Sequence, residues 1–339
     1  MAIKLKPLKD QVMVITGASS GIGLATARAA AAKGAKIVLV SRNEEALTKI
    51  EQEIKTKGGE AIHVTADVGN KEQVQWIVDT AMYHLGRIDT WVNDAGVSIY
   101  GRLEEVSDED NRRLFDTNFW GVVYGSLAAV RCMKSTGGAI INVGSEVSDV
   151  VVPLQGMYST SKHAVKGFTD ALRIELKEDK APISVTLIKP AGIDSPYPQH
   201  ARNYTDKELT LPAPVYAPEE VAYAILQAAT HPYRDIMVGG GAKVMSALNK
   251  RVPGLMDWIS ARFMTSQQVK QEPARHKQGS LHQAGEDGHV HGNHEGYVMK
   301  KSLYTRAKLN PAVTGTLVMA AGAVAYTIMN HNARSKATK

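Results

Sequence analysis

The segment from residue 12 to residue 33 constrains the fold most, because it combines a buried strand, a glycine-rich turn and a helix. Val12-Met13-Val14-Ile15 is an apolar run typical of buried parallel strands. The glycine-rich turn and an alanine-rich helical pattern follow it directly. Glycines let the main chain approach a pyrophosphate, and the N-terminus of the next helix directs N–H groups at it. The segment therefore predicts a nucleotide-phosphate site; the alternative is a tight structural turn. The turn comprises Thr16, Gly17, Ala18, Ser19, Ser20, Gly21, Ile22 and Gly23.

The rest of the first 241 residues continues to alternate between strands and helices with short connections. This alternation predicts an α/β fold, a doubly wound parallel sheet of seven strands with helices on both faces. Ligands of such sheets bind outside the carboxyl ends of the strands. After the first strand and helix, we expect strands at 36–40, 61–64, 88–92, 138–143, 183–188 and 236–238. The helices between them are expected at 44–57, 71–85, 108–134, 158–177 and 218–229.

Composition limits the class of protein and its compartment. The chain has 339 residues, 44% of them hydrophobic and 22% charged, which is typical of a soluble globular protein. A single cysteine, Cys132, excludes an internal disulfide and favours a reducing compartment. The first ten residues contain no apolar run, so we expect no signal peptide and a cytoplasmic location.

The net charge of +6 suits an anionic cofactor or an anionic membrane surface. No dense basic stripe is interleaved with aromatic residues, so nucleic-acid binding is not expected.

Polar residues follow the second and the third predicted strand at positions that can contact a nucleotide. Ser41 and Arg42 follow the second strand, where an NAD-preferring site usually has an acidic residue. Arg42 is placed to pair with a 2′-phosphate, which favours NADPH/NADP over NAD; alternatively it is a solvated surface arginine. Asp67 follows the third strand, where it accepts from an adenine amino group, caps the next helix, or does both.

A tyrosine and a lysine lie one helical turn apart at Tyr158 and Lys162. A nearby ammonium favours phenolate, so we expect Lys162 to lower the pKa of Tyr158 and make it a proton donor and acceptor. Such a pair alone is weak, because it is common on helices. Ser145 follows the fifth strand, and Asn118 lies within the apolar stretch 115–123, where it is either hydrogen-bonded in the core or functional.

Together with Asn93-x-Ala95-Gly96, these residues form a set of motifs that resembles that of the classical short-chain dehydrogenases/reductases. The resemblance covers about residues 8–241 and is specific because all motifs occur in the same order and spacing. It implies a Rossmann-like fold and an NADP-dependent enzyme that interconverts a carbonyl and an alcohol by hydride transfer. The motifs are Thr16-Gly17-x-x-x-Gly21-x-Gly23, Asn93-x-Ala95-Gly96, Asn118, Ser145 and Tyr158-x-x-x-Lys162.

The resemblance also implies roles for individual residues. Tyr158 would be the general acid/base, and Lys162 would lower its pKa and hold the nicotinamide ribose. Ser145 would hydrogen-bond the carbonyl, and Asn118 would hold a water that passes protons to Lys162. The cofactor would contact Gly17, Ser19, Ser20, Gly21, Ile22, Gly23, Ser41, Arg42, Asp67, Val68, Asn93, Ala95, Gly96, Tyr158, Lys162, Pro190 and Ile193.

Two departures from the family pattern leave these roles intact: Asp94 replaces a frequent asparagine, and Gly144 a frequent serine. Two other functions use the same fold, a nucleotide-sensing protein without turnover and a membrane-tethered scaffold. A homo-oligomer is expected by resemblance, paired through the helices that carry Asn118 and Tyr158. Residues 193–218 correspond to the substrate loop, where His200 and Arg202 either meet an anionic substrate or face water.

The chain beyond the family core divides into three further parts after the domain of residues 1–241. Residues 242–264 are an amphipathic helical extension that covers the pocket, packs on a partner subunit or lies on a membrane. Residues 265–301 are polar and without periodicity, which predicts a flexible linker. Its histidines at 289, 291 and 294 lack a fixed scaffold, so no metal site is expected.

The last part, residues 302–339, contains the uncharged segment 312–329. Its length just reaches a bilayer span, but its composition of Ala, Gly and Thr is only mildly apolar. The segment is therefore either a transmembrane anchor or a helix packed on protein.

Overall fold

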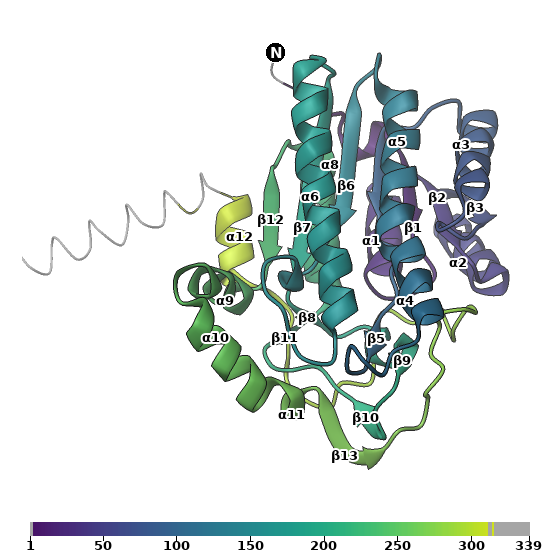
Figure 1. The fold of residues 1–339 in the computed structure, drawn as a ribbon. Coiled ribbons are helices and arrows are strands. Elements are labelled where there is room, and N and C mark those ends of the chain that lie inside the picture. The colour runs from purple at the N-terminus through teal and green to yellow at the C-terminus, as the bar shows by residue number, and fades with distance from the viewer. Residues whose placement is uncertain (1–2, 311–313, 315–339) are drawn as a thin grey trace, which may run out of the picture.

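The chain forms an open twisted sheet with helices on both faces (Figure 1). The computed structural model describes residues 3–310 and 314. The seven strands lie in the order β12-β7-β6-β4-β1-β2-β3 and all pair in parallel, which confirms the predicted doubly wound sheet. The strands are β1 (Val12–Thr16), β2 (Lys36–Ser41), β3 (Glu60–Thr65), β4 (Thr90–Asn93), β6 (Gly138–Val143), β7 (Ile183–Pro190) and β12 (Asp235–Val238).

Each face of the sheet has its own apolar core. Along β1, Met13 and Ile15 belong to one core, whereas Val12 and Val14 belong to the other, as the alternation of side chains along a strand requires. The first face is covered by α1 (Gly21–Ala31), α2 (Glu44–Thr56) and α8 (Pro218–Thr230). The second is covered by α3 (Lys71–Leu85), α5 (Gly121–Met133) and α6 (Gly156–Glu178).

The predicted helix over 108–134 is interrupted in the structure. It consists of α4 (Asp108–Phe115), a π-helical turn (Asp116–Trp120) and α5. Asn118 lies in the π turn and is fully buried. Its side chain accepts from the Val97 N–H at 2.8 Å and donates to the Val97 carbonyl at 2.9 Å. A π turn inserts one extra residue into a helix, and here the inserted turn holds Asn118 against the segment after β4.

Short elements surround the carboxyl ends of the sheet. The segment 193–218, predicted as the substrate loop, contains α7 (Tyr197–His200), β9 (Arg202–Asn203), β10 (Lys207–Leu209) and β11 (Val215–Tyr216). The other short elements at these ends are β5 (Ile99–Tyr100), which pairs with β9, η3 (Glu146–Ser148), and β8 (Gly192–Ile193), which pairs with β11. The short helix η1 (Leu8–Asp10) precedes β1 at the opposite end of the sheet.

The C-terminal extension returns to the domain instead of leaving it. After the helical segments, β13 (Val269–Pro273) pairs with β10, and β14 (Val298–Met299) pairs with β11. The segment 265–301 therefore differs from the flexible linker that we expected. It is joined to the domain by hydrogen bonds, many of them through its main chain, and such bonds leave no apolar periodicity in the sequence. The helical segments are α9 (Gly240–Arg251), α10 (Pro253–Ile259), a π turn (Ser260–Met264) and α11 (Thr265–Gln267).

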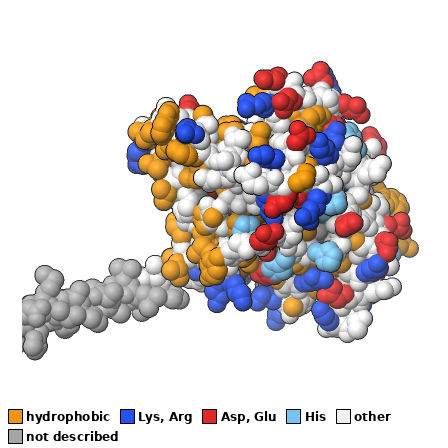
Figure 2. Space-filling view, turned by 90° about the horizontal axis from the view of Figure 1, so that it is seen from below, with side chains coloured by type: hydrophobic (Ala, Val, Ile, Leu, Met, Phe, Trp, Pro, Cys, Tyr) orange, Lys and Arg blue, Asp and Glu red, His pale blue; other side chains and the backbone are white. Residues whose placement is uncertain are grey.

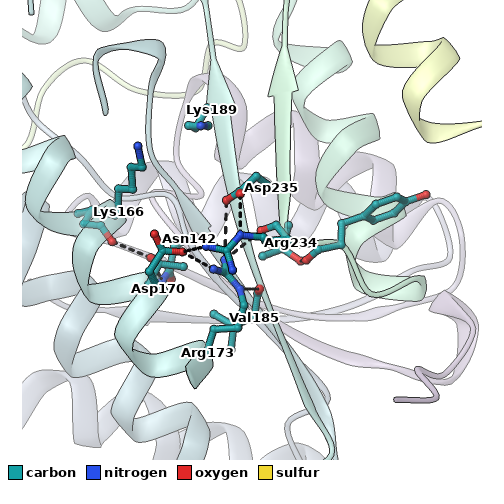
Figure 3. A network of polar contacts seen from close by, with 12 residues as sticks. Asn142, Lys166, Asp170, Arg173, Val185, Lys189, Arg234 and Asp235 are labelled. Carbon is teal, nitrogen blue, oxygen red and sulfur yellow. Dashed lines mark hydrogen bonds and ion pairs between the residues drawn. The ribbon is translucent and has the colours of Figure 1, made fainter. Parts of the chain in front are cut away.

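A charged network fixes α6 to the edge of the sheet (Figure 3). Arg173 of α6 binds Asp170 at 2.5 Å and donates to the Val185 carbonyl of β7 at 3.0 Å. Arg234, just before β12, binds the same Asp170 at 2.6 Å. Arg173 also lies 3.8 Å from Asp235 at the start of β12. The helix that carries the tyrosine and lysine is thus held at two strands.

The last described helix, α12 (Leu303–Leu309), packs on α8 through an ion pair whose carboxylate is buried. The carboxylate of Glu220 is fully buried and lies 2.6 Å from Arg306, whose guanidinium stacks on Tyr223 at 3.5 Å from the ring centroid. Among the described residues, no helix has the length and apolar character needed to cross a membrane. The predicted anchor at 312–329 lies outside these residues.

Removing the cation of this pair is expected to destabilise the protein. Arg306→Met leaves the Glu220 carboxylate buried without its partner and should lower the free energy of unfolding by about 2–3 kcal/mol. The matched control, Lys49→Met, breaks an exposed pair with Glu45 and should change it by less than about 0.5 kcal/mol. Urea denaturation measures both. Equal effects of the two substitutions would contradict this account.

Candidate active site

One cavity of about 270 Å³ lies at the carboxyl ends of the strands. It extends from Arg42 at the end of β2, past the glycine-rich turn, to Tyr158 on α6. Most residues that the sequence predicted for a cofactor and a reaction line this single cavity. They are Gly17, Ser19, Ser20, Gly21, Ile22, Ser41, Arg42, Asp67, Val68, Ala95, Gly96, Ser145, Tyr158, Lys162, Pro190 and Ile193.

The glycine-rich turn packs directly against the chain after β4. Gly17 has φ +70°, and a Cβ there would lie 2.9 Å from main-chain atoms of Ala95. A Cβ at Gly23 would collide with the carbonyl oxygen of Gly17. Gly23 does not line the cavity; its lack of a side chain lets α1 approach the turn. The N-terminus of α1 therefore faces the cavity, as the predicted phosphate site requires.

The side chains of Tyr158 and Lys162 meet at the other end of the cavity. The Lys162 Nζ lies 5.7 Å from the centroid of the Tyr158 ring and donates to the Val143 carbonyl at 2.9 Å. Burial lowers the pKa of Lys162 to about 8, although the charge of Asp94 acts in the opposite direction. Lys162 is therefore close to its titration midpoint at mildly alkaline pH.

Ser145 is held at the end of β6 by its own capping interaction. Ser145 is the N-cap of the short helix η3, and its Oγ accepts from the Val147 N–H at 3.3 Å. This bond fixes the hydroxyl on the side of the cavity where Tyr158 lies.

The pKa of Tyr158 differs from our prediction. Burial raises it to about 12, while hydrogen bonding with Tyr197 and Ser145 lowers it to a smaller extent. Lys162 lies over the ring and is itself 5% exposed. The sequence showed the spacing of Tyr158 and Lys162 but not the desolvation of the phenol, which dominates here.

Two predicted asparagines lie behind the cavity and do not line it. Asn118 binds Val97, as described, and donates to the Ser161 Oγ at 3.2 Å. Asn93 is buried and donates to the Asn142 Oδ1 at 2.8 Å and the Ser126 Oγ at 3.0 Å. Their side chains hold the main chain on which the cavity residues lie. A Cβ at Gly96 would lie 3.5 Å from Asn118 and 3.8 Å from Lys162, so Gly96 lies next to both side chains.

At the end of the cavity away from Tyr158, the charged side chains of Arg42 and Asp67 both bind other groups of the protein. Arg42 donates to the main-chain carbonyls of Ser280, Leu281 and Gln283 in the C-terminal extension. Burial lowers the pKa of Arg42. Asp67 binds Arg113 at 2.5 Å, and it is not the cap of α3, because Asn70 accepts the capping N–H.

The structure adds residues that the sequence did not single out. Burial raises the pKa of Asp94 and of Glu146 to about 7, and both carboxyls line the cavity. The Tyr197 hydroxyl lies 2.7 Å from both Ser98 and Gln155. Only Asp94 carried a sequence signal, its departure from the family asparagine.

The half of the cavity beyond Tyr158 is mainly apolar. The extension contributes Met245 of α9 and Met264 of the second π turn, so it covers this half, one of the alternatives left open by the sequence. His200 lines the cavity, whereas Arg202 binds Asp110 at 2.9 Å. The other apolar lining residues there are Val147, Val150, Val152, Leu211 and Pro212.

The described part of the chain contains no group of three side chains able to hold a metal ion. His291 instead lies between Asp194 at 3.1 Å and Glu219 at 3.0 Å.

The fold and the cavity together define a dinucleotide-binding oxidoreductase. The family model described as short chain dehydrogenase matches residues 11–206, and the chain belongs to the short-chain dehydrogenase/reductase family. It is 48% identical over 328 residues to "Uncharacterized oxidoreductase YxnA" of Bacillus subtilis, covering 96% of this chain and 92% of that protein. It is 32% identical over 261 residues to "11-beta-hydroxysteroid dehydrogenase A" of Sesamum indicum, covering 74% of each.

Solved structures agree with this assignment. A short-chain dehydrogenase/reductase from Burkholderia phymatum in complex with NAD has a TM-score of 0.65 and 27% identity, covering 72% of this chain and 94% of that one. An alcohol dehydrogenase from Thermococcus sibiricus complexed with 5-hydroxy-NADP has a TM-score of 0.60 and 28% identity, covering 67% and 95%.

Lys162 is expected to set the alkaline limb of the pH–rate profile, and the charge on Asp94 is expected to shift that limb. Lys162 carries its proton below its pKa of about 8 and loses it as the pH rises, so turnover should fall through that region. Asp94→Asn removes the charge that raises the pKa of Lys162, so the limb should move to lower pH. The measurement is kcat/KM from pH 6 to 10 for both proteins. A limb that stays in place or moves upward would exclude the coupling.

Proposed function

We propose that the protein is an NADP-dependent oxidoreductase that interconverts an apolar carbonyl compound and its alcohol. The observation that carries this proposal is that Ser145, Tyr158 and Lys162 face the same cavity as the glycine-rich turn and Arg42. A substrate oxygen near Tyr158 and a dinucleotide on the turn would therefore share one cavity.

The residues present fit a nicotinamide dinucleotide. Gly17 and Gly21 of the glycine-rich turn have no side chain that would block a pyrophosphate at the N-terminus of α1. Asp67 and Val68 would flank the adenine, and Pro190 and Ile193 would contact the nicotinamide. When bound, the nicotinamide supplies or accepts the hydride.

In the proposed reaction, the side chains of the protein transfer one proton to or from the substrate oxygen. Ser145 hydrogen-bonds the carbonyl oxygen and orients it toward Tyr158. In the reductive direction Tyr158 gives its proton to that oxygen while the carbonyl carbon gains the hydride. The charge of Lys162 stabilises the phenolate that results, and the proton returns to Tyr158 from solvent. The raised pKa of Tyr158 favours the protonated state from which reduction begins.

The preference for NADP rests on Arg42 at the end of β2. The position has no acidic residue for the ribose hydroxyls of NAD, and a guanidinium suits a 2′-phosphate. Asp287 of the extension lines the same end of the cavity, and its carboxylate opposes a 2′-phosphate. The proposal requires that Arg42 outweighs it.

We also propose that the substrate is apolar and that the protein forms a homo-oligomer. The apolar lining beyond Tyr158 suits a carbonyl group on an apolar body. Trp120 and Leu127 on the α5 side are 43% and 41% exposed, and Ile174 of α6 is 64% exposed. These side chains give the two helices an apolar outer surface that a second copy would bury.

Tyr158→Phe tests the reaction. Loss of the phenol should lower kcat by about 10²–10⁴-fold without changing NADPH affinity, because the hydroxyl acts on the proton. Tyr204→Phe is the control: its hydroxyl binds Asp110 at 2.8 Å outside the cavity. Turnover is measured spectrophotometrically with a panel of apolar ketones. Full turnover in Tyr158→Phe would refute the mechanism, and NADPH binding without turnover in the wild type would favour a nucleotide sensor.

Arg42→Ala tests the cofactor preference. Fluorescence titration should give tighter binding of NADPH than of NADH in the wild type. The variant should lose about tenfold or more of its NADPH affinity and a smaller part of its NADH affinity, because the charge-assisted bond to the 2′-phosphate is lost only for NADPH. Arg28→Ala, which breaks a surface pair with Glu53, is the control. Equal affinities of the wild type for both cofactors would contradict the preference.

A further inference from the structure

The C-terminal extension crosses the carboxyl ends of the strands, the side of the molecule on which the cavity opens (Figure 1). We call residues 277–292 the strap. Its residues Ser280, Ala284, Gly285 and Asp287 line the cavity at the end where Arg42 lies. We infer that the strap is part of the cofactor site: it covers the adenosine half of the bound dinucleotide and is displaced when the dinucleotide enters or leaves. This inference rests on the proposed function.

The strap runs along the glycine-rich turn on one side of the cavity. The Gly288 N–H donates to the Ser19 carbonyl at 2.8 Å, and the Gly21 N–H donates to the His289 carbonyl at 2.9 Å. Ser19 and Gly21 both belong to the predicted phosphate site. The strap main chain therefore lies next to the position that a pyrophosphate would take.

The strap also fixes the orientation of Arg42. The Leu281 and Gln283 carbonyls each lie 3.1 Å from its guanidinium, and the Ser280 carbonyl is a third acceptor. A guanidinium has five N–H donors, so these bonds leave two that the three carbonyls do not use. Arg42 is thus held in place with donors left for a phosphate. Asn43 extends this contact by donating to the Gly285 carbonyl at 3.2 Å.

On the opposite side of the cavity the strap is bound to the substrate loop and α4. The Ser280 N–H donates to the His200 carbonyl at 2.7 Å, and the His200 ring lies 2.8 Å from the Glu286 carbonyl. His282 lies 2.7 Å from Asp110 of α4. The strap therefore bridges the two sides of the cavity, and a nucleotide between them would be covered.

The interactions of the strap allow it to open. Leu281 is fully buried and packs with Val97 and Leu114 in a small cluster that also contacts Tyr158. Most other contacts are hydrogen bonds near the surface; Figure 2 views the molecule from this side, where charged and histidine side chains are interspersed. Segments with few buried apolar contacts open at a lower free energy than the core.

Two glycines allow the strap to be displaced without changing any residue that lines the cavity. Gly279 has φ +57°, and a Cβ there would collide with the main-chain oxygens of His200 and Ala201. A Cβ at Gly292 would collide with the Ser195 carbonyl oxygen. The double variant Gly279→Ala/Gly292→Ala should therefore push both ends of the strap off the domain. The matched control is Gly58→Ala, which has φ +81° but open space for a Cβ.

The decisive measurement is the rate of NADPH dissociation from the full chain by stopped-flow fluorescence. The double variant should release NADPH about tenfold faster than the wild type or more, and Gly58→Ala should stay within about twofold. Tryptic cleavage after Lys277 monitors the position of the strap independently. Faster cleavage with an unchanged dissociation rate would overturn the inference.

A second variant tests the contact while the strap stays in place. Asp287→Asn removes the carboxylate that faces the adenosine end, so the ratio of NADPH to NADH affinity should rise about threefold or more. An unchanged ratio, together with an unchanged dissociation rate in the double variant, would overturn the inference. A wild-type protein that binds neither cofactor would refute the proposed function instead, so the two failures are distinguishable.

Discussion

The hydroxyl of Thr16 joins the two strand ends on which the site is built. At the end of β1 it donates to the Val92 carbonyl at 3.2 Å and accepts from the N–H groups of Asp94 and Ala95, both at 3.1 Å. The next residue, Gly17, packs directly on the main chain of Ala95 because it has no side chain. The Thr16 hydroxyl therefore fixes the ends of β1 and β4 relative to each other, and a shift of either strand would move both the phosphate end and the reactive end of the cavity.

The sheet and most cavity residues could be predicted from the sequence because their signals are local. Apolar runs, turn glycines and the spacing of Tyr158 and Lys162 are local patterns, and parallel strands bring their carboxyl ends together whatever the intervening sequence. Asn93 and Asn118 illustrate the limit: both were placed in the right region, but only the structure shows that their side chains bind buried groups behind the cavity.

Long-range contacts account for what the sequence did not predict. The polar segment 265–301 has no periodicity because main-chain bonds join much of it to the domain, and nothing local reveals that Arg42 meets carbonyls some 240 residues away. Desolvation is likewise a property of the assembled fold. It raises the pKa of Tyr158 and lowers that of Lys162, and therefore opposes the simple effect of a cation beside a phenol.

Asp149 has a consequence for how the chain is divided into parts. Asp149 directly follows η3. Its carboxylate binds Lys166 and lies 2.6 Å from Lys189 and 3.1 Å from Ser246 of α9. A family core cut after residue 241 would keep both cations but lose the hydroxyl. It would also lose the bond from Asn249 to the Asp149 carbonyl. Helix α9 is consequently a structural component of the loop after β6, and α9 should unfold together with the core rather than as a separable module.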